Sequence, residues 1–265
     1  MMTAKSARMG WLMAALMLLP LGARPVQASD VVIYTENYPP YNFTDMDGTV
    51  TGLNTAKVRQ VMARSGLSYD IVVLPWARAL RRARTEKNAF IYSIARIPER
   101  EKHFDWLVPL APSNFFLFAR TDEKRPVSTA ALQKGLFLAA CVSGDVTCDL
   151  MRSLGIPESK LIVLTDRGTN DFRLVIAGRA DLYMSDKNAN VRLRRMEGYD
   201  PALTKPVFGL GTRAGFYLAA GKQVSADLRG KVHAAYMALM KAGKYHMEDA
   251  PGPGKSGPKK SGPGK

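Results

Sequence analysis

The chain has 265 residues, of which 46% are hydrophobic, and 38 Lys and Arg stand against 23 Asp and Glu. This composition excludes a mostly disordered chain and a collagen-like one, and the length suffices for a buried core. The formal net charge is +15, of which three cations precede residue 29 and four lysines follow residue 249, leaving +8 on residues 30–249. Such an excess of positive charge could favour the binding of nucleic acid, an anionic surface or an anionic small ligand.

Residues 1–28 have the pattern of a secretory signal peptide. Lys5 and Arg8 precede the uncharged apolar run Met9–Leu21, and the small residue Ala28 offers a cleavage site before Ser29. The run of about 13 residues is shorter than the roughly 20 that a membrane-spanning helix needs, and no later stretch is apolar enough. We therefore expect export to a bacterial periplasm, no membrane span in the mature chain and no nucleic-acid partner.

From residue 31 the hydrophobic periodicity predicts strands that alternate with helices. The first group comprises a strand at Val31–Thr35, a helix at Asn54–Ser65, a strand at Tyr69–Leu74, a helix at Trp76–Thr85, and strands at Phe90–Ile94 and Phe115–Ala119. Asn54 or Thr55 is expected to cap the first helix, and Gly66 is expected to end it. This order predicts an α/β unit.

The alternation restarts after a charged turn at residues 121–125. The second group comprises a short helix near Ala130, a strand at Leu136–Cys141, a helix at Thr147–Leu154, a strand at Leu161–Leu164, a helix at Thr169–Ala177, a strand at Asp181–Met184, a helix at Asn188–Met196, a strand at Ala214–Ala220 and a helix at Ala226–Lys241. Two α/β units of similar size predict two lobes with a ligand cleft between them, at the carboxyl ends of the strands.

We expect lobe 1 to contain residues 29–120 and 208–249, and lobe 2 to contain residues 121–207. Residues 250–265 contain only Ala, Pro, Gly, Ser and Lys, so they have nothing to bury and are expected to be a flexible tail.

The cysteines and histidines bear on cross-links and metals. In an oxidising compartment Cys141 and Cys148 could form a short-loop disulfide or remain two free thiols. His103, His233 and His246 lie far apart and lack the spacing of metal ligands on one helix. We expect no metal and no cofactor.

The longest cationic cluster lies in the second predicted helix and consists of Arg78, Arg81, Arg82 and Arg84. Helical spacing spreads these side chains round a polar face without interleaved aromatic residues. We interpret the cluster as a solvated face, with a docking patch for a partner as the alternative.

Five short motifs, each weak alone, follow one another in a characteristic order. They are Tyr38-Pro39-Pro40-Tyr41, Thr51-Gly52-Leu53, Ile97-Pro98-Glu99-Arg100, Ala177-Gly178-Arg179-Ala180-Asp181 and Ala242-Gly243-Lys244-Tyr245. Through them the chain resembles, over residues 30–249, the extracellular solute-binding proteins of the polar amino acid type that serve ABC importers. The resemblance implies an α/β, two-lobed periplasmic binding protein-like fold (type II), with each lobe a small sheet domain and a two-segment hinge that lets the lobes close on a ligand.

The resemblance also implies two charged ligand contacts. Arg100 would hold a ligand carboxylate, for which a guanidinium offers parallel donors and a permanent charge. Asp186, in the opposite lobe, would hold an α-ammonium, so that a zwitterion bridges the lobes and favours closure. From the residues alone, Arg100 could instead belong to a solvated charge run, and Asp186 could cap a helix.

Further positions match the walls of the family's pocket. Tyr38 and Trp76 match aromatic positions around the ligand side chain, with packing inside the lobe as the alternative for each. Tyr92, Ser93 and Ala95 fall on a loop that helps to hold the ammonium and carboxylate, and Ala95 replaces a hydroxyl residue common there.

In lobe 2, Gly144, Asp145 and Val146 lead into a helix whose N–H groups would complete the carboxylate site. Asp145 and Val146 stand where the family often has a hydroxyl residue, and Asp145 could cap the helix or accept a cationic ligand group.

Arg96 could contact a second acidic ligand group or form a surface salt bridge. Asn54 stands at the start of the first helix, where the family frequently has an acidic residue. We interpret this difference as a change of the helix-capping residue.

These features predict a monomeric periplasmic protein that captures a small zwitterionic or carboxylated ligand, an amino acid or a relative of one, for an inner-membrane ABC permease. The alternatives are an accessory or sensory protein with another ligand, and a dehydratase-like enzyme. An enzyme would need an acid or base in the cleft, for which Asp145, Asp186 and Glu36 are candidates. No nucleophile-base pair or metal set accompanies them, so we expect no enzymatic activity.

Overall fold

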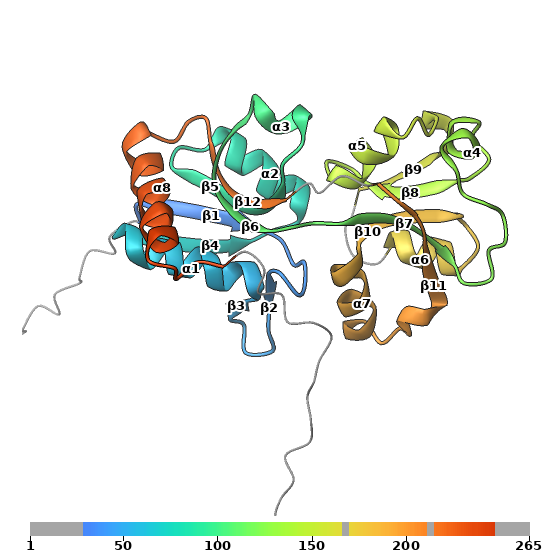
Figure 1. Ribbon diagram of the computed structural model, residues 1–265, viewed down its shortest axis with the longest axis horizontal. Helices are drawn as coiled ribbons and strands as arrows, with labels where there is room; N and C mark the ends of the chain where they lie inside the picture. The colour runs from blue at the N-terminus through green and yellow to red at the C-terminus, as the bar shows by residue number, and fades with distance from the viewer. Residues whose placement is uncertain (1–28, 166–169, 211–214, 247–265) are drawn as a thin grey trace, which may run out of the picture.

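The computed structural model describes residues 29–165, 170–210 and 215–246. Two five-stranded sheets, each flanked by helices, form two lobes that lie side by side (Figure 1). The α/β, two-lobed fold class predicted from the sequence is confirmed. The predicted signal peptide and tail lie outside the described residues. Within the described ranges, no helix combines the length and apolar character that crossing a membrane requires.

Lobe 1 is built on a sheet with the strand order β4-β1-β5-β12-β6. The strands are β1 (Val31–Thr35), β4 (Tyr69–Val73), β5 (Ala89–Ala95), β6 (Phe104–Ala111) and β12 (Phe216–Gly221). β1 runs parallel to β4 and β5, whereas β12 is inserted antiparallel between β5 and β6. The remaining elements are the hairpin β2 (Phe43–Thr44) and β3 (Val50–Thr51), α1 (Leu53–Ser65), α2 (Trp76–Thr85), α3 (Pro98–Glu101) and α8 (Ala226–Lys241).

The alternation of side chains along β5 explains how helices cover both faces of this sheet. Phe90 and Tyr92 pack into the apolar cluster formed with α1 and α8, whereas Ile91 packs into the cluster formed with α2. Every residue of β5 is buried, as expected for a central strand covered on both sides.

Lobe 2 has the strand order β11-β7-β10-β8-β9. The strands are β7 (Phe115–Arg120), β8 (Ala139–Val142), β9 (Leu161–Leu164), β10 (Leu182–Asp186) and β11 (Thr204–Gly209). The helices are α4 (Thr129–Gln133), α5 (Val146–Ser153), α6 (Asn170–Ile176), α7 (Lys187–Met196) and the short 3-10 turns at Glu158–Lys160 and Pro201–Leu203.

The chain passes from lobe 1 to lobe 2 between β6 and β7 and returns between β11 and β12 (Figure 1). This differs from the expected boundary after residue 120. Because β7 pairs with β10 and β11, it belongs to the second sheet, and the first crossing lies at residues 112–114.

The two lobes share an apolar cluster at the hinge. Tyr41 and Phe216 of lobe 1 lie with their ring centroids 5.0 Å apart, and Phe216 meets Phe115 of lobe 2 at 6.2 Å. These rings belong to one buried cluster with side chains from both sheets, such as Ala95 and Met184. The lobes are therefore in direct contact beside the crossing segments.

The start of α1 differs from the prediction. The helix begins at Leu53, after Gly52, which makes no side-chain capping bond, while Gly66 ends the helix in the left-handed conformation as expected. A Cβ atom at Gly52 would lie 2.4 Å from the Tyr41 carbonyl oxygen, so only glycine allows this close approach. Asn54, expected as a cap, is instead buried toward β5.

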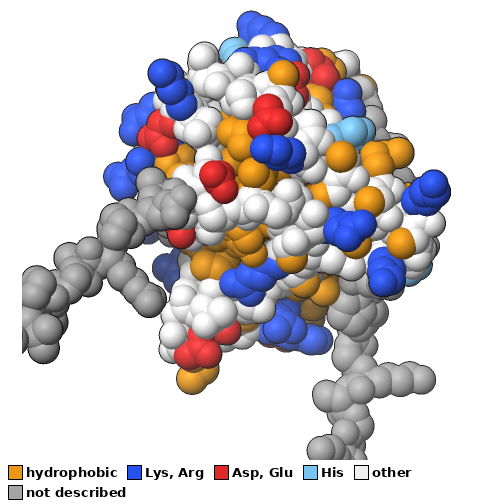
Figure 2. Space-filling view, turned by 90° about the vertical axis from the view of Figure 1, so that its left-hand side faces the viewer, with side chains coloured by type: hydrophobic (Ala, Val, Ile, Leu, Met, Phe, Trp, Pro, Cys, Tyr) orange, Lys and Arg blue, Asp and Glu red, His pale blue; other side chains and the backbone are white. Residues whose placement is uncertain are grey.

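The arginines of α2 are dispersed. Arg82 pairs with Glu86 at 2.5 Å and lies 5.0 Å from the centroid of the Tyr34 ring, and Arg84 lies over Phe104. Figure 2 shows the lobe 1 end of the molecule, where Lys and Arg side chains are scattered between acidic and apolar groups and do not merge into one patch. This arrangement favours a solvated basic face.

Candidate ligand-binding site

A cavity of about 570 Å³ lies between the two lobes. Lobe 1 contributes the segments that follow β1, β4 and β5, and lobe 2 contributes the β8–α5 turn, the end of β10, and side chains of α6 and α7. The cavity therefore lies at the carboxyl ends of parallel strands, where open α/β sheets bind ligands.

The structure brings together most of the residues singled out in the sequence. Those that line the cavity are Tyr38, Trp76, Ser93, Ala95, Arg100, Asp145 and Val146. Tyr92, Gly144 and Asp186 do not line it. Sequence reasoning did not place Phe43, Thr44, Phe115, Thr147, Asp171, Ser185, Arg194, Glu197 and Phe216 in the pocket, although all of them line it.

Arg100 lies on the short helix α3 and is only 3% exposed, so it is not part of a solvated charge run. Its Nη1 donates to the Ala95 carbonyl oxygen at 3.2 Å, and its Nη2 donates to the Gly144 carbonyl oxygen of lobe 2 at 3.4 Å. The guanidinium also lies 5.4 Å from the centroid of the Trp76 ring. These contacts fix a permanent positive charge on the wall of the cavity.

Trp76 starts α2 and forms both a wall of the cavity and part of the lobe 1 core. Its indole Nε1 donates to the Gly144 carbonyl oxygen at 2.7 Å. Gly144 does not line the cavity, but its carbonyl oxygen accepts from both Trp76 and Arg100. This oxygen thus joins lobe 2 to lobe 1 through hydrogen bonds to two residues that line the cavity.

Replacing Trp76 with phenylalanine is expected to weaken ligand binding about fivefold. Phenylalanine keeps an aromatic ring at this position. The closed arrangement, however, loses one hydrogen bond between the lobes, worth about 1 kcal/mol. Isothermal titration of the variant with a ligand found for the wild type measures the change, and equal affinity would show that this bond does not stabilise the closed state.

Asp145 is 3% exposed and caps α5, because its Oδ1 accepts from the Thr147 backbone N–H at 2.8 Å. The capping alternative is therefore correct. Asp145 also lines the cavity, as does Val146, the next residue in the chain. The Asp145 carboxylate adds negative charge to the wall at the N-terminus of α5.

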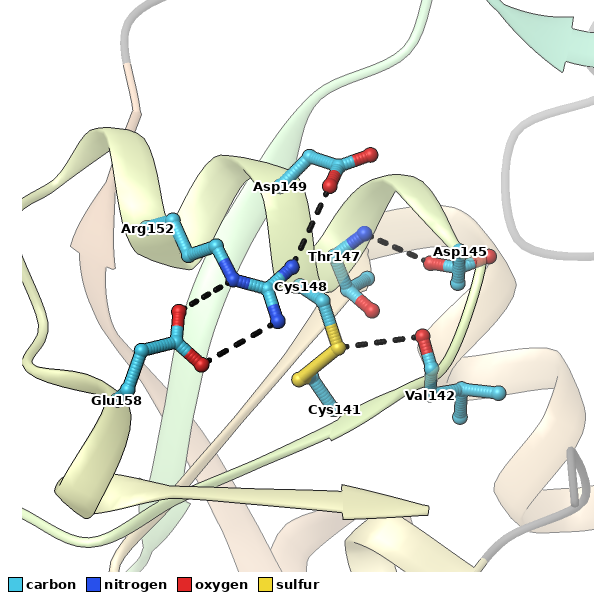
Figure 3. The surroundings of a disulfide bond; sticks show 8 residues. All are labelled: Cys141, Val142, Asp145, Thr147, Cys148, Asp149, Arg152 and Glu158. Atoms are coloured by element: carbon cyan, nitrogen blue, oxygen red, sulfur yellow. Dashed lines mark hydrogen bonds and ion pairs between the residues drawn. A yellow bond between two sulfur atoms is a disulfide. The ribbon is translucent and has the colours of Figure 1, made fainter. Parts of the chain in front are cut away.

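A disulfide between Cys141 and Cys148 closes the loop that carries Asp145 (Figure 3). Cys141 belongs to β8 and Cys148 to α5, and their Cα atoms are 5.1 Å apart. Of the two alternatives left open by the sequence, the structure shows the disulfide. The cross-link restrains the turn that brings Gly144 to lobe 1.

Replacing both cysteines with serine is expected to lower the free energy of unfolding by roughly 2.5 kcal/mol, because the unfolded chain regains the entropy of a short open loop. Thermal unfolding should then occur about 5 to 10 °C lower. Wild-type protein treated with a reductant serves as the matched control and should reproduce the shift. A melting temperature unchanged in both samples would exclude a stabilising cross-link.

Asp186 ends β10 and caps α7. Its Oδ1 accepts from Asn188 N–H at 3.0 Å, from Ala189 N–H at 3.1 Å and from the Tyr41 hydroxyl at 2.9 Å, while its Oδ2 accepts from Asn114 N–H at 2.8 Å. The residue is 1% exposed. Burial raises the pKa of the carboxyl, and these donors oppose the rise.

Asp186 therefore caps a helix, as the alternative interpretation held. It does not line the cavity in which a contact with a ligand ammonium was expected. The Tyr41 hydroxyl belongs to lobe 1 and donates to the Asp186 carboxylate of lobe 2. Burial and the neighbouring carboxylate raise the pKa of Tyr41, so that its hydroxyl stays protonated. Sequence reasoning missed this contact, since Tyr41 entered only as part of a motif.

Tyr92 and Ser93 are neighbours in β5 but point in different directions. The Tyr92 hydroxyl lies 2.8 Å from Thr55 Oγ1 inside lobe 1, and burial raises its pKa to about 12. Ser93 lines the cavity, and its Oγ accepts from Asn54 Nδ2 at 3.0 Å. Asn54 thus contacts a residue that lines the cavity and is not a helix cap.

The charged side chains that line the cavity are the carboxylates of Glu36, Asp145, Asp171 and Glu197 and the guanidinium groups of Arg100 and Arg194. Glu36, named from the sequence as a candidate acid or base in the cleft, is buried directly after β1, at the carboxyl end of the strand. Burial raises the pKa of Glu197, whose Oε2 lies 3.6 Å from Arg194 Nη1. Such a site suits a ligand that carries both a carboxylate and a cationic group.

Arg96 lies away from this cavity. It pairs with Glu101 at 2.7 Å and lies 5.5 Å from the centroid of the Trp106 ring at the surface, which agrees with the salt-bridge alternative. Within the ranges that the structure describes, no cluster of three His, Cys, Asp or Glu side chains has an arrangement that could hold a metal ion.

Comparison with solved structures gives relatives of the same fold. A histidine kinase sensor domain with similarity to periplasmic binding proteins matches with a TM-score of 0.70 and 19% identity, over 81% of this chain and 91% of that chain. An ancestral arginine-binding protein bound to arginine matches with a TM-score of 0.67 and 17% identity, over 81% and 93% of the two chains.

A periplasmic His/Glu/Gln/Arg/opine family-binding protein from Silicibacter pomeroyi, in complex with lysine, matches with a TM-score of 0.64 and 20% identity, over 80% of this chain and 92% of that chain. At these identities the likeness concerns the fold. Comparison with curated proteins finds no match.

The family model of the bacterial extracellular solute-binding proteins, family 3, matches residues 31–247. This match spans both lobes and includes the five motifs on which the resemblance rests. The chain belongs to family 3 of the bacterial extracellular solute-binding proteins.

Proposed function

We propose that this protein captures a small amino-acid-like solute in the cleft between its lobes, in the periplasm, and delivers it to an ABC permease of the inner membrane. The observation that carries the proposal is the cavity of about 570 Å³, into which both lobes direct charged and aromatic side chains. Family membership supports a binding protein, and two of the solved relatives hold arginine or lysine.

Arg100 is proposed to hold a carboxylate of the solute. The guanidinium is anchored by two backbone carbonyl groups and by the Trp76 ring, so little side-chain entropy is lost when a ligand binds. A carboxylate is also the group that a buried arginine binds best, because two parallel hydrogen bonds accompany the charge pair.

Glu36 and Asp145 are proposed to hold a cationic group of the solute. They come from opposite lobes, both are buried, and both line the cavity. A cation between them would draw the lobes together, since its pairing with both carboxylates requires the closed arrangement. Tyr38 and Trp76 then enclose the apolar part of the solute.

Thermal unfolding of the purified protein against a panel of amino acids, amines and dicarboxylates tests the proposal. A ligand present at 100 times its dissociation constant stabilises the folded state by about 2.7 kcal/mol, which raises the melting temperature by roughly 5 to 10 °C. We expect such a shift with an amino acid that carries a cationic side chain, and none with a dicarboxylate.

Mass spectrometry of the recovered ligand is the control for enzymatic activity. A solute released unchanged after prolonged incubation agrees with capture, whereas conversion to a product of different mass would contradict it. A panel without any thermal shift would also contradict the capture of an amino-acid-like solute.

A further inference from the structure

Ser93 interrupts the regular alternation of β5. The φ angle of Ser93 is 57°, a left-handed backbone conformation that residues with a side chain rarely adopt. Tyr217 and Leu218 of β12 pair with Ile94 and Tyr92, which leaves Ser93 as the extra residue of a β-bulge. The bulge turns Ser93 toward the cavity, where it is 7% exposed. Strained backbone held beside a cavity indicates a functional position.

Asn54 donates a hydrogen bond to the Ser93 hydroxyl. The Asn54 side chain is 0% exposed, and its Nδ2 donates to Ser93 Oγ at 3.0 Å. A hydroxyl can donate one hydrogen bond and accept two. Since Asn54 uses an accepting position, the hydroxyl hydrogen remains to be donated, and no residue in the described ranges accepts it. The cavity lies on the open side of Ser93.

We propose that Asn54 is a specificity-determining residue, which makes the Ser93 hydroxyl a hydrogen-bond donor toward an acceptor oxygen of the ligand. An aspartate at position 54 could only accept, so the Ser93 hydroxyl would donate to it and turn a lone pair toward the cavity. The amide therefore leaves the Ser93 hydroxyl with a donor for a carboxylate or carbonyl oxygen at this wall, which an aspartate would take up.

The inference rests on the proposed function and deepens it, because Arg100 and Ser93 line the same cavity from lobe 1. Arg100 supplies the charge that attracts a carboxylate, and Ser93 supplies a directed hydrogen bond to it. Asn54 does not line the cavity, so it acts through Ser93 as a positioning residue.

Acetate is the minimal probe, and isothermal titration measures its binding. The experiment compares the wild type, Asn54→Asp, Ser93→Ala and the double variant. We expect Asn54→Asp to weaken acetate binding about tenfold and Ser93→Ala about fivefold, in the range of a lost hydrogen bond to a charged group. In the Ser93→Ala background, Asn54→Asp should add less than about twofold.

An equal loss of affinity from Asn54→Asp with and without Ser93 would overturn the proposal, since the new charge alone would then explain the loss. Arg100→Ala separates this failure from that of the proposed function: acetate that binds the wild type but not this variant supports the carboxylate site whatever Asn54 does. Wild-type protein that does not bind acetate would overturn the donor role of Ser93, whereas the thermal-shift panel of amino acids decides the proposed function.

Asn54→Ala provides a second test if the buried aspartate prevents folding. It removes the orienting N–H without adding charge, and we expect acetate to bind about threefold more weakly. The loss should disappear in the Ser93→Ala background. Unchanged acetate affinity in Asn54→Ala would overturn the proposal.

Discussion

Replacing Arg100 with alanine is expected to reduce the affinity for a carboxylated solute by about 100-fold or more. The ligand carboxylate would enter a closed cavity without its charged partner, and a charge that is desolvated without pairing costs several kcal/mol. Isothermal titration with the ligand identified by thermal shift measures the effect. An affinity within about twofold of the wild type would remove Arg100 from the site.

Arg100→Lys is the matched control. Lysine keeps the positive charge but cannot make the parallel pair of hydrogen bonds, so an intermediate loss is expected. Because Arg100 also donates to Ala95 and Gly144, the thermal stability of each variant must be compared before the loss of affinity is assigned to ligand contact.

Replacing Asp186 with alanine is expected to lower the free energy of unfolding by about 3 to 4 kcal/mol. The change removes the cap of α7 and leaves the Asn114 and Asn188 N–H groups and the Tyr41 hydroxyl without their buried acceptor. Urea unfolding measures the difference. A loss below about 1 kcal/mol would show that water replaces the carboxylate, contrary to the burial described here.

Tyr41→Phe is the control for the contact between the lobes. It removes only the hydroxyl and keeps the ring packed against Phe216, so a loss of about 1 kcal/mol is expected. If Tyr41→Phe were as destabilising as Asp186→Ala, the capping of α7 would contribute nothing.

The sequence allowed the prediction of the regular, well-patterned elements but not of two edge strands that contain proline. β1, α2, β9 and α8 match their predicted bounds, because each has a clear period and a clear stop. β6 and β11 were missed, since Pro109 and Pro206 interrupt their apolar pattern. Both strands lie at a sheet edge, where proline is tolerated.

The site could be predicted where a family motif fixes a residue and not where packing decides the direction of a side chain. Arg100 and Trp76 reach the cavity as expected. Tyr92 does not, because the alternation of β5 turns it toward Thr55, and only the bulge after it brings Ser93 to the cleft. Because β5 is buried on both faces, the shift in alternation that the bulge causes is not visible in its hydrophobic pattern, and the position of the bulge could not be predicted.

The insertion of β12 between β5 and β6 has a consequence for the order of synthesis. β12 begins at Phe216, after the whole of lobe 2, so a growing chain presents β5 and β6 with unpaired edges until lobe 2 has been made. Open strand edges favour pairing with other chains, and incomplete sheets bind chaperones for the same reason. The topology therefore delays the completion of the lobe 1 sheet until lobe 2 has been synthesised.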